Sequence, residues 1–376
     1  MKKKQRPIAV DLFCGAGGMS VGFEQAGFDV VASFDNDPIN VETYKINHPS
    51  SSVHRADLGT ATGKGLRLLA GLEGVKIDVL FGGPPCQGFS EIGRSRAEDP
   101  RNLLLVHFAR LVDELRPDYF VLENVRGLLF GRTSHILNDC LKSLEGAGYS
   151  IVTPIRVIDA SDYGVPQQRR RVFIMGGLKG LPLPDYPDPR HGNSSVGKVP
   201  KTTVWEAIGD LPHVERSEEP INTDTFHGKL KTPSNYARIL RSEERDHEDK
   251  SLTDRYPLGF LTGCSRVLHG PEIVKRFSAT EPGTCESVSR LYRLKKDGVS
   301  RALRAGTLRP QGAFTAARPI HPTSPRCITV REGARLHSFP DWYQFHVTKW
   351  HGFRQIGNAV PPLLARSVAK EIAKLL

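Results

Sequence analysis

The first half of this 376-residue chain alternates short apolar runs with stretches of helical spacing, and this rhythm constrains the fold more than any other feature. Apolar runs typical of buried strands cover residues 7–13, 29–34, 77–81, 118–125, 151–158 and 170–176. Helical stretches lie between most of them, for example at 102–115 and 136–148. Near-continuous apolar strands that alternate with helices predict a parallel sheet covered on both faces. Ligands of such sheets bind outside the carboxyl ends of the strands, which defines a candidate binding rim.

A glycine-rich turn, "CGAGG" at 14–18, follows the first expected strand and precedes a helical stretch. Backbone N–H groups at a helix N-terminus attract anionic groups, and glycine lets a ligand approach the backbone closely. Asp35 ends the second expected strand, where an acid can bind the ribose hydroxyls of an adenosine. Asp57 follows an expected third strand. The pattern predicts an adenosine-containing cofactor, but the turn is not G-x-G-x-x-G and does not favour a nicotinamide dinucleotide.

Cys86 follows the strand expected at 77–81, in the segment "GGPPCQGFS". The two prolines before it fix the local φ angles, and the glycines around it allow an unusual backbone path. Such a loop can hold a reactive thiol in one position on the rim. A buried cysteine packed as a small apolar side chain is the commoner state, so position alone leaves both interpretations open.

Two further segments bring polar side chains to the same rim. Glu123 lies near the end of the strand at 118–125, where a carboxyl group beside a thiol can act as an acid. In "QQRRR" at 167–171, Arg169 and Arg171 share one face of an extended segment. Their guanidiniums could hold a phosphate or a carbonyl oxygen and favour a nearby thiolate. A surface carboxylate and a solvated basic edge are the alternatives.

Charge points to a polyanionic partner, most simply nucleic acid, because the chain carries a net charge of +11. Residues 276–331 contain 11 Lys and Arg but only 3 Asp and Glu. A solvated basic face would show the same excess. No apolar run approaches the ~20 residues of a membrane span, and no signal peptide is evident. The six cysteines form no CxxC pair, so we expect reduced thiols, no metal site and a cytoplasmic protein.

Six motifs then occur in a characteristic order along the chain. They are "DLFCGAGGMS" (11–20), "GGPPCQGFS" (82–90), "ENV" (123–125), "QQRRRVF" (167–173), "PRCITVREGARLHSFPD" (325–341) and "QIGNAVPP" (355–362). In this order they closely resemble the DNA (cytosine-5)-methyltransferases, especially the bacterial single-chain enzymes of restriction-modification systems. The resemblance covers most of residues 7–180 and 318–376.

The resemblance implies an α/β fold: a Rossmann-like, S-adenosylmethionine-dependent methyltransferase sheet with a second, smaller target-recognition domain. The expected division is a catalytic and cofactor-binding domain at 1–183, a target-recognition domain at 184–325, and a C-terminal segment at 326–376 that returns to the first. The proline-rich stretch at 181–189 is expected as a linker. The expected cofactor residues are Phe13, Gly15, Gly17, Asp35, Asp57, Leu58, Pro85, Leu104 and Asn358.

The same resemblance implies the chemistry. Cys86 would add to C6 of a cytosine flipped out of duplex DNA, and Glu123 would face N3 and the exocyclic amine of that base. Arg169 would contact the base carbonyl and Arg171 would brace the loop or Glu123, although the two roles could be exchanged. The expected DNA-binding residues are Gln87, Ser90, Arg304, Arg309 and Arg318. A Thr-Leu pair often opens this recognition segment in the family, whereas Ala302 and Leu303 stand here, so base contacts cannot be carried over from relatives.

Two alternatives stay open at this point. One is a transfer RNA cytosine-5 methyltransferase of the same fold, and the other is a catalytically silent nucleic-acid-binding relative. For the favoured interpretation we expect double-stranded DNA as the partner and a restriction endonuclease that acts separately on the same site. We also expect a monomer with no membrane contact, associated with the nucleoid through DNA.

Overall fold

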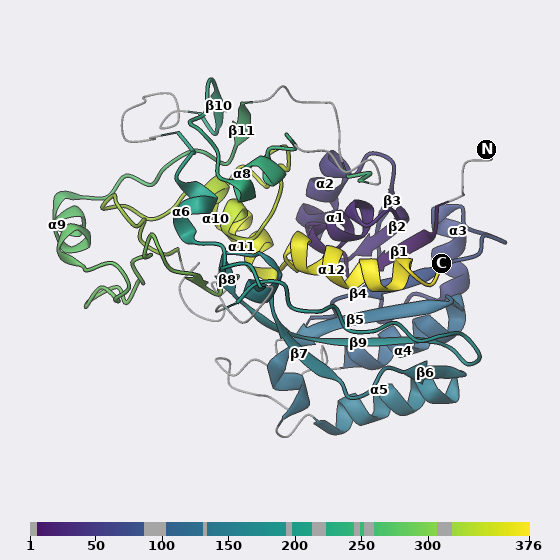
Figure 1. Cartoon of the computed structure of the whole chain (residues 1–376). Coiled ribbons are helices and arrows are strands. Elements are labelled where there is room, and N and C mark those ends of the chain that lie inside the picture. The colour runs from purple at the N-terminus through teal and green to yellow at the C-terminus, as the bar shows by residue number, and fades with distance from the viewer. Residues whose placement is uncertain are drawn as a thin grey trace.

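The computed structural model describes residues 6–85, 103–130, 134–192, 198–212, 223–243, 249–251, 259–306 and 318–376. Within them, an eight-stranded sheet forms the centre of the first half of the chain (Figure 1). Its strands are β1 (Ile8–Leu12), β2 (Asp29–Asp35), β3 (Ser52–Arg55), β4 (Val79–Gly82), β5 (Tyr119–Val125), β6 (Tyr149–Ile151), β7 (Arg156–Asp159) and β9 (Arg170–Leu178). They lie in the order β3-β2-β1-β4-β5-β9-β6, and β7 pairs with β9.

The five neighbouring strands β3, β2, β1, β4 and β5 pair in parallel, so their carboxyl ends share one edge of the sheet. The expectation of parallel pairing is wrong for β6, β7 and β9, because β9 runs antiparallel to β5 and the other two run antiparallel to β9. Only residues 160–169 separate β7 from β9, whereas a parallel crossover takes a dozen or more residues. The run at 151–158 is also divided between β6 and β7, with Pro154 in the break, where no ladder hydrogen bond is needed.

Helices cover both faces of the sheet (Figure 1). One face carries α3 (Gly63–Ala70), α4 (Leu104–Leu115) and α5 (Ser134–Gly146), and their apolar residues share a core with the strands. The other face carries α1 (Gly18–Gln25) and α12 (Pro362–Ala373), which form a second core. A Cβ at Gly22 of α1 would lie 2.5 Å from the Cβ of Ala365 in α12, so glycine permits this close helix contact. The end of the chain thus packs on its beginning.

Two further helices complete the rim of the sheet. α2 (Pro38–Asn47) begins after Asp37, whose carboxylate accepts a hydrogen bond from the N–H of Ile39. α11 (Lys349–Asn358) lies before α12 and ends close to the start of α1. A Cβ at Gly18 would lie 2.4 Å from the carbonyl oxygen of Val360, directly after α11.

The middle of the chain has short elements and no βα rhythm among its described residues. They are α6 (Val204–Ile208), β10 (Thr225–His227), α8 (Asn235–Leu240), β11 (Phe260–Thr262), α9 (Pro271–Ala279) and β12 (Ser300–Arg301). Many of these elements pack with α10 (Val330–Leu336) and α11 in a third core. Figure 1 shows α9 projecting from the molecule on the side away from the sheet.

α10 is tied to the middle region by buried arginines. The Arg335 guanidinium contacts the carboxylates of Asp210 and Asp341 and donates to the carbonyl oxygen of Ala207 at 2.9 Å. Arg331 donates from Nε to the carbonyl oxygen of Thr262 at 2.9 Å. α10 is therefore a short helix that braces the middle region.

The proline-rich stretch at 181–189 lies along the sheet rather than apart from it. The hydroxyl groups of Tyr119, Tyr163 and Tyr186 fasten this stretch to the sheet through hydrogen bonds. Tyr119 Oη donates to the carbonyl oxygen of Pro182 at 3.1 Å, and Tyr163 Oη donates to that of Pro187 at 2.8 Å. Tyr186 donates to the carbonyl oxygen of Phe173 at 2.6 Å.

None of the described helices has the length and apolar character needed to cross a membrane.

Candidate active site

Glu123 occupies the carboxyl end of β5, opposite Phe173 of β9. Its side chain is buried, and Oε1 lies 2.8 Å from Nε of Arg171, which pairs with Val125 on the neighbouring strand. Burial raises the pKa of Glu123, although the Arg171 and Arg169 guanidiniums act in the opposite direction. The arrangement therefore holds a carboxyl group in a fixed orientation while favouring its neutral form.

The segment that leads to Cys86 leaves the sheet at β4, directly beside β5. A Cβ at Gly82 would lie 2.1 Å from the carbonyl oxygen of Leu12, and a Cβ at Gly83 would lie 3.0 Å from Oε2 of Glu123. Neither glycine has a positive φ. Close packing, rather than the unusual backbone path expected from the sequence, explains why glycine stands at these two positions. Gly82 lets β4 approach β1, and Gly83 makes room for the carboxyl group of Glu123.

Asn124 of β5 joins this segment to the strand. Its amide Nδ2 donates to the carbonyl oxygen of Pro84 at 3.2 Å, and its side chain is buried. The chain approaching Cys86 is thus held by the residue after Glu123. Cys86 itself, with Gln87, Ser90 and Arg309, lies outside the described residues.

Arg169 is buried and engages backbone carbonyl groups. Nη1 donates to Leu303 O at 3.0 Å, and Nη2 donates to Gly357 O at 2.7 Å and to Ala359 O at 2.9 Å. Arg171 instead makes the ion pair with Glu123. Arg171 thus contacts Glu123, one of the two partners expected for it, whereas Arg169, expected at the base carbonyl, binds backbone carbonyl groups.

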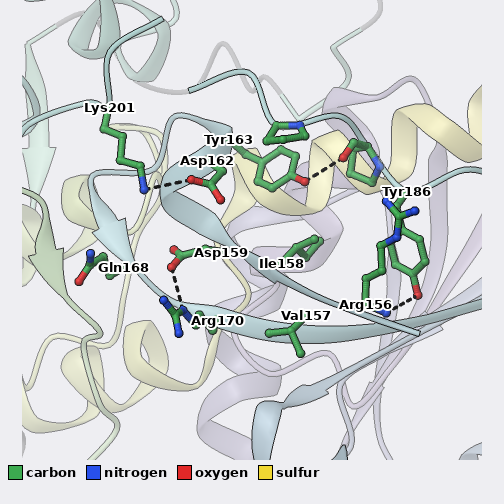
Figure 2. A pocket seen from close by; sticks show the side chains of 12 residues that line it. Arg156, Val157, Ile158, Asp159, Asp162, Tyr163, Gln168, Arg170, Tyr186 and Lys201 are labelled. Carbon is green, nitrogen blue, oxygen red and sulfur yellow. Dashed lines mark hydrogen bonds and ion pairs between the residues drawn. The ribbon is translucent and has the colours of Figure 1, made fainter. Parts of the chain in front are cut away.

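A pocket of about 420 Å³ lies on the other side of the Gln167–Arg171 segment, lined by Gln168 and Arg170 (Figure 2). This alternation agrees with the expectation that Arg169 and Arg171 share a face. The pocket also lies against β7, the 3-10 helix η3 (Ala160–Tyr163) and the 181–189 stretch. Two of its cations face carboxylates: Arg170 lies 3.3 Å from Asp159, and Lys201 lies 3.0 Å from Asp162. The third, Arg156, lies over the ring of Tyr186.

The glycine turn after β1 meets Asp35 at the end of β2. Asp35 Oδ2 accepts from the N–H of Gly15 at 2.9 Å, and Oδ1 accepts from the N–H of Asp37 at 2.8 Å. Burial raises the pKa of Asp35, and these N–H groups lower it. Oδ1 also accepts from Nδ2 of Asn40 at 3.4 Å, whereas Oδ2 accepts only from Gly15 among the described residues and retains acceptor capacity towards a ribose.

The backbone of the turn adopts left-handed conformations at Phe13 (φ 62°), Gly15 (φ 53°) and Gly17 (φ 85°). A Cβ at Gly17 would lie 2.5 Å from Nε2 of His48 and 2.7 Å from Oη of Tyr343. Glycine is required there both by conformation and by space. The open side of the turn is different, since a Cβ at Gly15 would meet nothing within 4 Å. That space suits a ligand at the residues expected to hold the cofactor.

Other residues expected at the cofactor are distributed around the same edge. Asp57 is exposed, and a Cβ at Gly59 would lie 3.1 Å from its Oδ1 and 3.6 Å from Cδ2 of Leu104. The Leu58 side chain is buried in the core. Pro85 and Asn358 are exposed, at the end of the described β4 segment and at the end of α11. The structure thus brings Asp57 together with Leu104, and the end of α11 together with the glycine turn.

A buried polar group beneath the turn was not foreseen from the sequence. Nδ1 of His48 lies 2.9 Å from Oε1 of Glu24, and Tyr343 Oη donates to the carbonyl oxygen of Ala16. These residues lie far apart along the chain and carry no local motif. Among the residues that the structure describes, no three His, Cys, Asp or Glu side chains are placed to hold a metal ion.

Of the two expected DNA-binding arginines that are described, Arg304 is exposed. It follows Leu303, the residue bound by Arg169. The Arg318 guanidinium is half-buried and lies 5.8 Å from the ring centroid of Phe353. Both flank the segment expected to meet DNA.

The chain is similar in sequence to known proteins. The family model described as C-5 cytosine-specific DNA methylase matches residues 8–374. The Type II methyltransferase M.XorII of Xanthomonas oryzae pv. oryzae is 49% identical, over 99% of this chain and 85% of the relative. The Type II methyltransferase M.AgeI of Thalassovita gelatinovora is 33% identical, over 96% of this chain and 98% of the relative.

Solved structures have a similar fold. A putative DNA modification methyltransferase encoded within an E. coli prophage superposes with a TM-score of 0.81 at 32% identity, over 98% of this chain and 99% of that one. The S. pombe Dnmt2 methyltransferase shares the fold, with a TM-score of 0.57 at 19% identity over 99% and 98% of the two chains. The chain therefore belongs to the C-5 cytosine-specific DNA methylases, enzymes that transfer a methyl group from S-adenosylmethionine to C5 of cytosine in DNA.

Proposed function

We propose that Cys86 is the nucleophile of this methyl transfer and that Glu123 and Arg171 assist it. The thiolate of Cys86 adds to C6 of the cytosine, and the electrons of the C5–C6 double bond make C5 nucleophilic. C5 takes up the methyl group, its proton passes to water, and the Cys86–C6 bond breaks to restore the aromatic base and the thiolate. The observation that carries the proposal is the buried Glu123–Arg171 pair, directly beside the segment that leads to Cys86.

Glu123 supplies a proton at N3 of the base and takes it back when the Cys86–C6 bond breaks. Its pKa is raised by burial, so the carboxyl group holds a proton closer to neutral pH than an exposed glutamate does. Protonation or hydrogen bonding at N3 withdraws electrons from the ring and stabilises the thiolate adduct. Arg171 orients the carboxyl group through Oε1, which leaves Oε2 beside Gly83 and the segment leading to Cys86.

The cofactor lies, in this proposal, at the glycine turn. Asp35 accepts hydrogen bonds from the ribose hydroxyls, Asp57 and Leu58 contact the adenine, and Phe13, Gly15 and Gly17 shape the turn. Pro85, Leu104 and Asn358 close the site. S-adenosylmethionine supplies the methyl group, which its positively charged sulfur makes electrophilic.

DNA enters between the carboxyl edge of the sheet and the middle region. The cytosine leaves the duplex, because a stacked base cannot present C6 to a thiol. Arg304, Arg309 and Arg318, with Gln87 and Ser90, are proposed to contact DNA, and phosphate contacts outnumber base contacts in such interfaces. This assignment makes 184–325 the recognition domain and returns 326–376 to the catalytic domain.

The biological setting follows from the relatives, which are named as Type II methyltransferases. We propose that this enzyme acts as a monomer on one short duplex sequence, associated with the nucleoid. A separate restriction endonuclease would recognise the same sequence. Methylation would then protect the chromosome from cleavage.

A random-sequence duplex library tests the proposal. The library is incubated with enzyme and S-adenosylmethionine, then treated with bisulfite and sequenced. We expect protected cytosines at one position of one short motif, and none with Cys86→Ala, although that variant still binds the duplex. Protection by the Cys86→Ala variant at the wild-type rate would overturn the assigned nucleophile.

A further inference from the structure

Three segments that are distant in sequence meet at Arg169. Its guanidinium binds Leu303 O of the recognition segment and, through the other terminal nitrogen, the carbonyl oxygens of Gly357 and Ala359. The residue between those two carbonyls is Asn358, which is exposed and assigned here to the cofactor. One rigid planar fork therefore spans the recognition segment and the cofactor segment.

Gln167 makes a second bridge between the same parts. Its Oε1 accepts from the N–H of Leu303 at 3.0 Å, and its Nε2 donates to Nδ1 of His337 at 2.9 Å. His337 Nε2 then lies 2.9 Å from Ala359 O. Burial lowers the pKa of His337 well below its usual range, so a neutral ring with its proton on Nε2 satisfies both contacts.

Backbone contacts leave no slack in this junction. β12 pairs in parallel with β8 (Gln167–Gln168), which places Ser300 beside Gln167. A Cβ at Gly357 would lie 2.3 Å from the backbone nitrogen of Ala305. The recognition segment at 300–305 thus rests directly on the backbone that ends α11, and neither can shift without disturbing the other.

We propose that Gln167 and Arg169 form a clamp through which cofactor binding and DNA binding strengthen each other. This inference rests on the proposed assignment of Asn358 to the cofactor and Arg304 to DNA. A cofactor that contacts Asn358 orders residues 357–359, and the clamp passes that order to 300–305. DNA then pays a smaller entropic cost to order the segment that carries Arg304, and the reverse holds with the same factor. Gln167 and Arg169 act in this clamp as positioning residues, because their buried side chains bind the two segments that carry Arg304 and Asn358.

The test measures binding of S-adenosylhomocysteine, an unreactive cofactor probe, by calorimetry with and without a saturating duplex of the sequence found by the bisulfite experiment. For the wild type we expect the duplex to tighten probe binding by about fivefold or more. In Arg169→Lys the charge remains, but one ammonium cannot span the three carbonyl groups. We expect the ratio of the two affinities to fall towards one, while the variant still binds each ligand alone.

Arg170→Lys is the matched control, because Arg170 is the next residue, is exposed and pairs with Asp159 on the opposite side of the segment. Its affinity ratio should equal that of the wild type. Gln167→Met removes the bond to Leu303 and should lower the ratio as well, which keeps the test decisive if Arg169→Lys does not fold. A wild-type ratio in either folded variant would overturn the clamp, as would a ratio of one in a wild-type enzyme that methylates DNA. A wild-type enzyme that binds the probe but methylates no duplex would instead overturn the proposed function.

Discussion

Arg171 and Arg335 both contact buried carboxylates, but the two regions differ in how completely charge is compensated. Arg335 is fully buried between Asp210 and Asp341, and Asp210 also receives Arg241 at 2.5 Å. These carboxylates raise the pKa of Arg335. Arg171 forms an ion pair with Glu123, and burial still raises the pKa of that glutamate.

The difference separates structure from chemistry. Arg335 and Arg241 meet Asp210 and Asp341, so each charge of this group has a partner. The group holds the middle of the chain to the C-terminal segment. At the end of β5 the carboxyl group is oriented but remains able to take and release a proton. Substitutions in the two regions should therefore affect stability and catalysis separately.

The largest effect is expected from Glu123→Gln. The amide keeps the size of the side chain but cannot donate an acidic proton to N3, so we expect the single-turnover methylation rate to fall by about 10²–10⁴. The glutamine side-chain oxygen can still accept a hydrogen bond from Arg171, so the thermal midpoint should fall less than in Arg335→Met, which removes every hydrogen-bonding group of its side chain. Rapid-quench measurement of tritiated methyl transfer gives the rate, and a rate within threefold of the wild type would contradict the role of Glu123.

Arg335→Met should act in the opposite way. It leaves the buried Asp341 without its Arg335 partner, while Asp210 keeps only Arg241. Removal of one member of a buried pair costs about 3–5 kcal/mol. Urea unfolding measures this loss. Single-turnover rates at a temperature where the variant is folded should stay near those of the wild type. Undiminished stability would show that the Arg335 network does not brace the fold.

Glu332 of α10 predicts how the second region responds to acid. Its buried carboxylate accepts two hydrogen bonds from Arg326, at 2.8 and 2.7 Å. Its pKa is lowered to about 2, with burial opposing the effect of Arg326 and His321. The stability that this ionised group contributes is present above its unfolded pKa and is lost as pH falls from about 4.5 towards 2. Unfolding free energies of Glu332→Gln should depend less on pH across that window, and parallel curves for the two proteins would contradict the assignment.

The smallest effect is a shift in the pH dependence of catalysis. Because Glu123 acts in its protonated form and its pKa is raised, the methylation rate should fall as pH rises through that pKa. Arg171→Gln removes a positive charge that opposes the rise, so the alkaline limb should move to higher pH. Single-turnover rates across pH, with Arg170→Gln as the control, measure the shift. A limb that moves to lower pH would contradict the electrostatic account.

The sequence predicted the parallel half of the sheet because its apolar runs are separated by stretches of helical spacing. It also placed Asp35 at the end of its strand and Glu123 near the end of its strand, as the structure does. The pairing of β6, β7 and β9 was not accessible, since strand direction depends on connection length and on Pro154 within one apolar run. The partners of Arg169 were not accessible either. They are backbone carbonyl groups at 303, 357 and 359, and a carbonyl group leaves no trace in a sequence.

The central claim is a transient bond between Cys86 and C6 of the target cytosine. A duplex with 5-fluorocytosine at the methylated position tests it most directly. The C5 hydrogen leaves as a proton, whereas fluorine at C5 cannot leave as a cation, so the enzyme stays attached. With S-adenosylmethionine present, the account predicts a denaturation-resistant enzyme–DNA complex whose modified peptide contains Cys86. An enzyme that methylates ordinary cytosine but forms no such complex, or forms it through another residue, would contradict the account.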